Sequence, residues 1–178
     1  LFSVFSVLIF SFTVLYPNAG ALVFTGLSIF YCAFVLLFQK QFENLNALCI
    51  YLSKSLLGFF YVGLLPAMAC LLLNLPNGKM WFYLLLAVVL SGDSMAYLVG
   101  VTLGKHKVMP EISPKKTFEG AIGGLLGSAI AGYLAQPFLP EIPVISIIFL
   151  SVITGAIAQF GDFFESLLKR VANIKDSG

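Results

Sequence analysis

Long, uninterrupted apolar runs constrain this chain more than any other feature of its sequence. The 178 residues are 60% hydrophobic and 10% charged, with a mean hydropathy of +1.00. A soluble core of this size cannot bury so many apolar side chains, so the sequence predicts an integral membrane protein. The runs lack the two-residue alternation of a membrane barrel. The helix is the other structure in which all backbone N–H and C=O groups are hydrogen-bonded within the protein, as lipid requires. We therefore expect an all-α, polytopic membrane helical bundle.

A membrane-spanning helix needs about 20 mainly apolar residues, and the chain offers about six such runs. The expected spans cover residues 1–16, 21–38, 56–73, 80–101, 120–139 and 144–164. Residues 41–55 mix polar side chains, among them Glu43 and Lys54, with apolar ones. This mixture predicts a helix that lies at the membrane interface and does not cross it.

No repeat, low-complexity tract or linker divides the chain. We predict a single integral membrane domain over residues 1–178, with N-terminal spans in about 1–73 and a catalytic part in about 80–178. The chain opens on apolar residues without a methionine or a basic leader. We therefore expect it to begin inside a longer natural sequence and do not interpret its start as a signal peptide.

The distribution of basic residues predicts the orientation of the spans. Lys40, Lys54, Lys105, Lys107, Lys115, Lys116, Lys169, Arg170 and Lys175 fall on one side of the predicted spans, and Lys79 alone falls on the other. The positive-inside rule places the first side in the cytoplasm. As a separate expectation, the membrane is the inner membrane of a bacterium, with the site on its cytoplasmic side. The net charge of +2 says little about partners, and we expect no nucleic acid among them.

Asp93 is a carboxylate inside the predicted span 80–101. A charge at mid-bilayer costs about 2.5 to 3.5 kcal/mol on the insertion scale, so intramembrane acids usually face a polar cavity and act there. We interpret Asp93 as functional. On a helix it shares one stripe with Tyr97, Gly100 and Gly104.

Glycines follow both Asp93 and the basic loop at helical spacing. We interpret Gly100 and Gly104 as small residues that let helices pack closely. Gly120, Gly124 and Gly127, together with Gly123, have the same spacing and predict tight packing of the next span against a neighbour.

The stretch 113–117 predicts a phosphate site at the start of a helix. Ser113 is the expected N-cap and Pro114 the first helical residue. The free N–H groups near Lys115, Lys116 and Thr117 would then point out of the helix end, where anions bind. On charge alone, an ordinary basic loop explains the two lysines equally well.

The closing stretch 159–178 carries the densest charge. If the helix continues, Asp162, Glu165 and Lys169 share one face and Asp176 returns close to it. Carboxylates of this kind suit Mg²⁺, and the basic side chains that can neutralise phosphate oxygens are Lys169, Arg170 and Lys175. The alternative is a juxtamembrane amphipathic helix with an ion pair between Glu165 and Lys169.

The remaining reactive residues exclude several chemistries. Cys32, Cys49 and Cys70 lie in apolar runs without metal-ligand spacing, and His106 is a lone histidine in a basic loop, which is usually solvated. The sequence contains neither a nucleophile-plus-base arrangement nor a Walker-type glycine loop. Charged clusters at helix ends favour phosphoryl or nucleotidyl transfer, in which positioning and charge neutralisation do most of the catalysis.

Five motifs between Asp93 and Gly178 make the sequence similar to a known family. They are DSMAYLVG at 93–100, SPKKTFEG at 113–120, QFGD at 159–162, SLLKR at 166–170 and KDSG at 175–178. In this order they resemble the phosphatidate cytidylyltransferases, also called CDP-diacylglycerol synthases. Two departures stand out: Phe118 occupies a position where tryptophan is common, and the family pattern continues past Gly178 with segments that are absent here. We therefore expect a C-terminally incomplete catalytic part, with no activity expected of this fragment alone.

The resemblance implies that CTP reacts with phosphatidic acid to give CDP-diacylglycerol and pyrophosphate, with Mg²⁺ as cofactor. It implies Asp162, Lys169 and Asp176 as catalytic residues and Asp162, Glu165 and Asp176 as metal ligands. The implied substrate or phosphate-binding residues are Asp93, Ser113, Lys115, Lys116, Thr117, Arg170 and Lys175. A homodimer is a further expectation. The alternatives are a CTP-dependent lipid kinase and, from another class, an ion or solute transporter.

Overall fold

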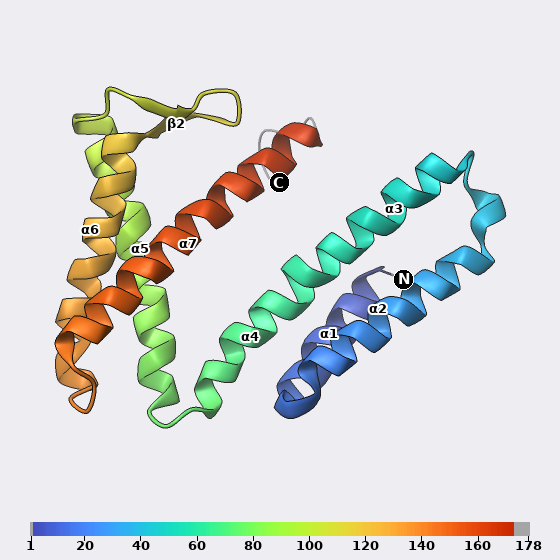
Figure 1. Cartoon of the computed structure of the whole chain (residues 1–178), viewed down its shortest axis with the longest axis horizontal. Helices are drawn as coiled ribbons and strands as arrows, with labels where there is room; N and C mark the ends of the chain where they lie inside the picture. The colour runs from blue at the N-terminus through green and yellow to red at the C-terminus, as the bar shows by residue number, and fades with distance from the viewer. Residues whose placement is uncertain (1, 173–178) are drawn as a thin grey trace. The chain divides into compact units, whose positions relative to one another are not determined.

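The computed structural model describes residues 2–172 and divides the chain into two compact units, Leu1–Gly78 and Lys79–Gly178 (Figure 1). The boundary falls at the first residues of helix α5 (Gly78–Thr102). The expected single domain therefore stays a prediction, and the two units are distinct packing entities.

Five helical stretches within residues 2–172 are long and apolar enough to cross a membrane. They are Pro17–Leu37, Leu45–Asn74, Gly78–Thr102, Phe118–Phe138 and Val144–Val171. A further apolar helix, α1 (Phe2–Leu15), is shorter than these. The one sheet in the described part of the chain is a two-stranded hairpin. The prediction of an all-α, multi-pass membrane protein is therefore confirmed.

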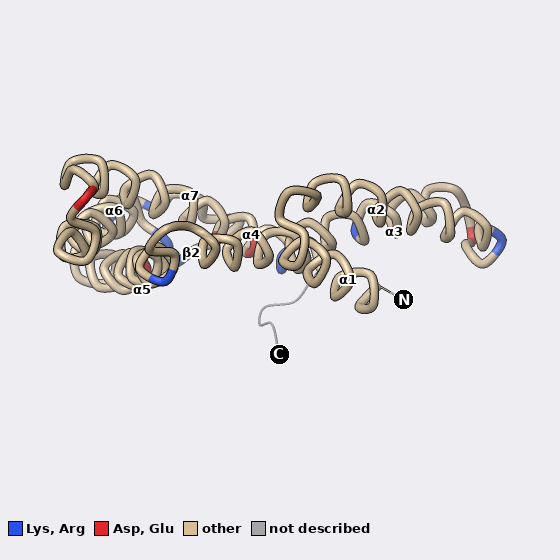
Figure 2. The backbone as a smooth tube through the Cα atoms, turned by 90° about the horizontal axis from the view of Figure 1, so that it is seen from below, with Lys and Arg blue, Asp and Glu red and all other residues tan. Residues whose placement is uncertain are grey.

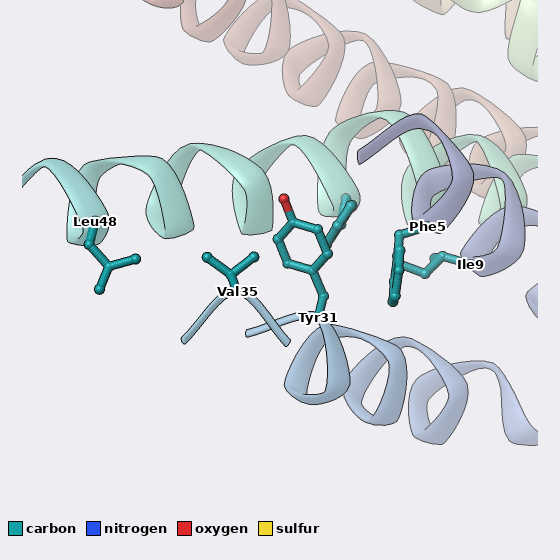
Figure 3. Packing of buried hydrophobic residues seen from close by; sticks show 6 residues of the cluster. Phe5, Ile9, Tyr31, Val35 and Leu48 are labelled. Carbon is teal, nitrogen blue, oxygen red and sulfur yellow. The ribbon is translucent and has the colours of Figure 1, made fainter. Parts of the chain in front are cut away.

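The first unit consists of helices around an aromatic core. Its elements are α1, η1 (Pro17–Ala19), α2 (Gly20–Leu37), η2 (Gln39–Gln41), α3 (Leu45–Gly58), η3 (Phe59–Leu64), α4 (Leu65–Leu71) and η4 (Leu72–Asn74). The core side chains come from α1, α2, α3 and η3, and Figure 3 shows five of them labelled. Tyr31 and Phe59 are fully buried and meet edge to face, with ring centroids 4.7 Å apart. Aromatic packing of this geometry stabilises the unit beyond simple burial.

Residues 41–55 do not form the separate helix that the sequence predicted. Instead, α3 begins at Leu45, and the helix runs without a break to Asn74. Asn44 caps it by accepting a hydrogen bond from the Ala47 N–H at 2.8 Å. No helix breaker precedes Pro66, and the π-helical turn η3 lies just before this proline, where the missing N–H must be accommodated. The polar residues therefore do not form a separate element and instead begin a helix that is long and apolar enough to cross a membrane.

The second unit packs three long helices and carries a small hairpin at one end. After α5 come β1 (Lys107–Met109), β2 (Ser113–Thr117), α6 (Phe118–Ala135), η5 (Gln136–Phe138) and α7 (Val144–Val171). The strands pair antiparallel, with Lys107 opposite Thr117 and Met109 opposite Ser113, and the register shifts between these pairs. We call residues 107–117 the basic hairpin, because Lys107, Lys115 and Lys116 lie on it.

Small residues bring α5 and α6 together, as their spacing predicted. A Cβ atom added to Gly120 would lie 2.8 Å from the Ala96 carbonyl oxygen and 3.2 Å from the Gly100 Cα. Gly123, Gly124 and Gly127 also face neighbouring helices at contact distance. Serines supply hydrogen bonds in the same interface, since Ser128 Oγ donates to the Val88 carbonyl at 3.2 Å. The prediction of close helix packing is confirmed.

Gly104 departs from the expected stripe. Helix α5 ends at Thr102, so Gly104 lies beyond the helix that carries Asp93 and Tyr97. It still lies against the Thr117 side chain, because a Cβ added there would come within 2.7 Å of Thr117 Oγ1.

Candidate active site

A pocket of about 710 Å³ lies at the hairpin end of the second unit. Its walls come from α5, the basic hairpin, α6 and α7. Its charged lining residues are Asp93, Asp162, Lys107, Lys115 and Lys116. Three lysines and two carboxylates thus share one cavity in a unit that is otherwise largely apolar.

The start of α6 differs from the sequence prediction. Ser113 and Pro114 belong to strand β2, and the N-cap is Thr117. Thr117 has extended backbone angles, φ −125° and ψ 155°, and its Oγ1 accepts a hydrogen bond from the Gly120 N–H at 3.1 Å. Pairing with β1 holds residues 113–117 extended, so the helix starts four residues later than Pro114. The predicted helix-end anion site around Lys115 and Lys116 is therefore wrong in its geometry.

The lysines nevertheless reach the pocket from the strand. Lys115, Lys116 and Thr117 all line it, whereas Ser113 is not among the lining residues. Figure 2 shows the basic residues around β2 in blue. Because a strand projects successive side chains to opposite faces, the register irregularity of this hairpin accounts for two adjacent lysines on one cavity.

Lys116 forms the closest charged contact in the pocket. Its Nζ lies 2.5 Å from Asp162 Oδ2 on α7 and 4.0 Å from the centroid of the Phe163 ring. The ammonium atom is closed off from solvent, while the Asp162 side chain keeps 51% of its surface exposed. One oxygen of Asp162 is therefore committed to the lysine, and the carboxylate remains accessible from the cavity.

Asp93 and Gln159 complete the polar lining. Asp93 is an exposed residue of α5 that lines the pocket together with Asp162. Gln159, which the sequence analysis left without a role, also lines it, and its Nε2 donates to the Ala121 carbonyl at 3.1 Å. The signal for Gln159 was present: a polar residue in an apolar span, three positions before Asp162, lies on the same helix face.

The rest of α7 is arranged partly as expected. The helix continues to Val171, so Asp162, Glu165 and Lys169 lie within one helix. Glu165 Oε1 pairs with Lys169 Nζ at 2.8 Å, which is the ion pair of the amphipathic alternative, and neither lines the pocket. Arg170 Nε donates to the Ile112 carbonyl at 3.2 Å and so bonds α7 to the basic hairpin. Lys175 and Asp176 lie outside the described residues.

A second polar cluster lies at the base of the hairpin. Glu119 Oε1 lies 2.6 Å from His106 Nδ1, and Glu119 Oε2 accepts hydrogen bonds from the Lys105 and His106 N–H groups at 3.0 and 3.2 Å. His106 is mostly solvated, as expected, with 77% of its side chain exposed. The sequence reasoning missed the partnership with Glu119, because it joins residues 13 apart across a turn.

The charged residues of the pocket fit a magnesium ion. Mg²⁺ usually takes one or two protein carboxylates and leaves its other positions to water and substrate phosphates. Asp93 and Asp162 offer two carboxylates in one cavity. Within residues 2–172 no three His, Cys, Asp or Glu side chains cluster tightly enough for an all-protein metal cage, and Mg²⁺ does not require one.

Comparison with known proteins identifies the family of this chain. The family model for the cytidylyltransferase family matches residues 1–178. A phosphatidate cytidylyltransferase of Bacillus subtilis is 41% identical over 103 residues, covering 57% of this chain and 38% of its own length. The Synechocystis enzyme of that name is 31% identical over 192 residues, covering 92% of this chain and 60% of its own length. A third, from Mycobacterium bovis, is 36% identical over 119 residues, or 66% of this chain and 39% of its own length.

These matches cover less than two thirds of the relatives' own lengths. The family assignment does not depend on that share, because the family model extends over the whole chain. The chain belongs to the cytidylyltransferase family.

Proposed function

We propose that the protein containing this chain transfers a cytidylyl group from CTP to phosphatidate, giving CDP-diacylglycerol and pyrophosphate. The observation that carries the proposal is the pocket in which three lysines and two carboxylates meet at one end of three membrane helices. Membership of the cytidylyltransferase family supports CTP as the donor. The names of the relatives favour phosphatidate as the acceptor.

The reaction needs little acid–base chemistry from the protein. An oxygen of the phosphatidate phosphate attacks the α-phosphorus of CTP, the bond to the β-phosphate breaks, and pyrophosphate leaves with that electron pair. The attacking phosphate is already largely ionised near neutral pH, since the second pKa of phosphomonoesters is about 6. The protein must instead hold two polyanions together, align them and neutralise their charge.

The pocket residues suit these tasks. Lys115 and Lys116 would bind phosphate oxygens, with Lys107 as a third cation in the same cavity. Thr117 caps α6 and fixes the strand on which the lysines lie. The roles of Ser113, Lys169, Arg170, Lys175 and Asp176 inferred from the family resemblance remain predictions.

Asp162 and Asp93 would hold Mg²⁺, which when bound supplies positive charge beside the triphosphate. Glu165 and Asp176, the other two ligands inferred from the resemblance, remain predictions. The Asp162 carboxylate orients Lys116 when no metal is present, because the two groups form an ion pair. Asp93 would add negative charge to the cavity wall and so favour cationic partners in the pocket.

The location of the pocket suits a lipid substrate. Its walls are ends of membrane-spanning helices, so the diacyl chains would remain in the bilayer while the head group meets CTP from the water phase. Basic residues of the second unit concentrate at this end, and Lys79 lies at the other. By the positive-inside rule we propose that the pocket faces the cytoplasm of a bacterial inner membrane. We likewise propose, without a test in the structure, that the protein forms a homodimer.

The test is turnover by the full natural protein in lipid nanodiscs with α-labelled CTP and phosphatidic acid. We expect pyrophosphate release and a labelled CDP-lipid. Release of CDP with a newly phosphorylated lipid would indicate a CTP-dependent lipid kinase. Ion flux without any CTP turnover would indicate a transporter. Lys79→Ala, at the opposite end of α5, is the control that should keep wild-type turnover, whereas Lys116→Ala should lose it.

A further inference from the structure

The carboxylate of Glu119 is shared by three donors from a single turn. The Lys105 N–H, the His106 N–H and the His106 ring nitrogen all lie within 3.2 Å of its two oxygens. Those donors belong to the turn that joins α5 to β1. Hydrogen bonds to an ionised acceptor are about twice as strong as neutral ones, so this carboxylate binds the turn firmly.

The same turn leads directly into the basic hairpin. The Phe118 N–H donates to the His106 carbonyl at 2.9 Å, and Lys107 pairs with Thr117 in the next register position. The first residues of α6 therefore hold His106 through both its backbone groups and its ring. Glu119 supplies the side-chain part of that hold.

Burial contributes little to the position of this turn. Lys105, His106 and Lys107 are all exposed, whereas Thr117, the strand partner of Lys107, is buried. An exposed turn keeps one conformation mainly through its hydrogen bonds. Lys107, which follows this turn, and Lys116, which precedes Thr117 on the paired strand, both line the pocket.

We propose that Glu119 is a positioning residue that fixes the base of the basic hairpin and thereby holds the hairpin lysines in the pocket. The proposal rests on the proposed function, because the lysines matter only if they bind substrate phosphate. A displacement of about 1 Å in such groups is enough to weaken a reaction that depends on alignment. The simpler role for an acidic residue here is to stabilise the start of α6 through the helix dipole.

The first test is hydrogen–deuterium exchange of the full natural protein in nanodiscs, without substrate. In Glu119→Ala we expect backbone amides of residues 105–117 to exchange about ten-fold faster, while those of residues 121–135 in α6 are unchanged. Glu119→Gln should show a smaller increase, because its amide oxygen still accepts from the two backbone donors. Glu141→Ala removes an exposed carboxylate from the other end of the unit and should change nothing in the hairpin.

Two exchange results would overturn the proposal. One is a hairpin in Glu119→Ala that exchanges at the wild-type rate. The other is an equal acceleration in α6, which would mean that Glu119 stabilises the helix start and not the hairpin. Neither result depends on turnover, so the positioning role is judged even if the proposed reaction fails.

The second test separates binding from chemistry. If the hairpin lysines bind CTP, Glu119→Ala should raise the KM for CTP about ten-fold and change kcat less than about three-fold, and Glu119→Gln should restore most of the KM. A KM equal to that of the wild type, with a mobile hairpin, would overturn the link between Glu119 and substrate binding. Absence of turnover in the wild type would instead reject the proposed function and leave the exchange result standing.

Discussion

At the scale of single residues, the contact between Lys116 and Asp162 decides what the pocket can bind. The two charges neutralise each other at 2.5 Å, and the Phe163 ring covers the ammonium. A polyanion that approaches Lys116 competes with Asp162, and a cation that approaches Asp162 competes with Lys116. When both bind, a metal ion can take the place of Lys116 beside Asp162. A nucleotide phosphate can likewise take the place of Asp162 beside Lys116.

Asp162→Asn should abolish turnover in the full natural protein and leave it folded. The substitution removes the carboxylate assigned to Mg²⁺ and leaves Lys116 without its counter-charge. The Asp162 side chain is 51% exposed, but the Lys116 ammonium is closed off from solvent, so we expect a loss of stability of about 1 to 3 kcal/mol. Turnover with CTP and phosphatidic acid, with thermal unfolding in the same nanodiscs, measures both quantities. Wild-type turnover in this variant would remove Asp162 from the site.

Lys116→Met should tighten Mg²⁺ binding in the absence of nucleotide. The ammonium competes for the Asp162 carboxylate, and a partly exposed ion pair is worth about 0.2 to 1 kcal/mol, which corresponds to an increase of about 1.4- to 5-fold in affinity. Calorimetric titration of the metal-free protein with Mg²⁺ measures the change, and Lys79→Met is the matched control at the other end of α5. An unchanged or weaker affinity would show that Asp162 is not where the metal binds.

At the scale of elements, the sequence predicted the helices of the second unit well and missed the hairpin. Apolar length fixed α5, α6 and α7, and glycine spacing predicted how α5 and α6 pack. The strands escaped prediction because their pairing joins residues ten apart, such as Lys107 with Thr117, and no periodic pattern records it. The N-cap is Thr117 and not Ser113 for the same reason. Strand pairing holds residues 113–117 extended, and Thr117 is the next residue of a type that caps helices.

Gly120→Ala should destabilise the second unit, whereas Gly161→Ala should not. A methyl group at Gly120 would meet the Ala96 carbonyl oxygen at 2.8 Å, and backbone atoms cannot move aside cheaply. Overpacking of this kind costs about 1 to 3 kcal/mol. Nothing lies within 4 Å of a Cβ at Gly161, so alanine there should be neutral or stabilising by up to about 1 kcal/mol. Thermal unfolding in detergent compares the two, and equal stability of both variants would contradict the packing described for α5 and α6.

At the scale of the whole molecule, composition predicted a membrane protein, and the family resemblance predicted a chemistry. The arrangement of the site could be seen only in the three-dimensional structure. Asp93, Lys116 and Asp162 are far apart in sequence and belong to three elements, and all three line one pocket. Lys107 and Gln159 also line this pocket, although the sequence analysis assigned neither of them a role in the site. Glu165 and Lys169, which looked equally promising as charges, pair with each other away from it. Glu165 and Lys169 lie about one and two turns further along α7 than Asp162, and neither is among the residues that line the pocket.

The direction of the second unit in the membrane gives the last prediction. Lys79 lies in the first turn of α5 and Glu141 lies between α6 and α7, at the end where Leu84, Leu139 and Ile147 pack together. With the native cysteines replaced, Lys79→Cys and Glu141→Cys should react with a membrane-impermeant maleimide in intact cells. Lys105→Cys, beside the hairpin, should react only after the cells are opened.

The reason is charge, since basic residues gather at the hairpin end of the unit and the positive-inside rule predicts that this end faces the cytoplasm. The proposed function also requires the pocket to meet CTP, which is made in the cytoplasm. The reverse labelling pattern would place the three lysines outside the cell, where CTP is absent, and a cytidylyltransferase site at this pocket would then be untenable. Labelling of all three positions in intact cells would mean instead that the chain is not held across the membrane as its helices predict.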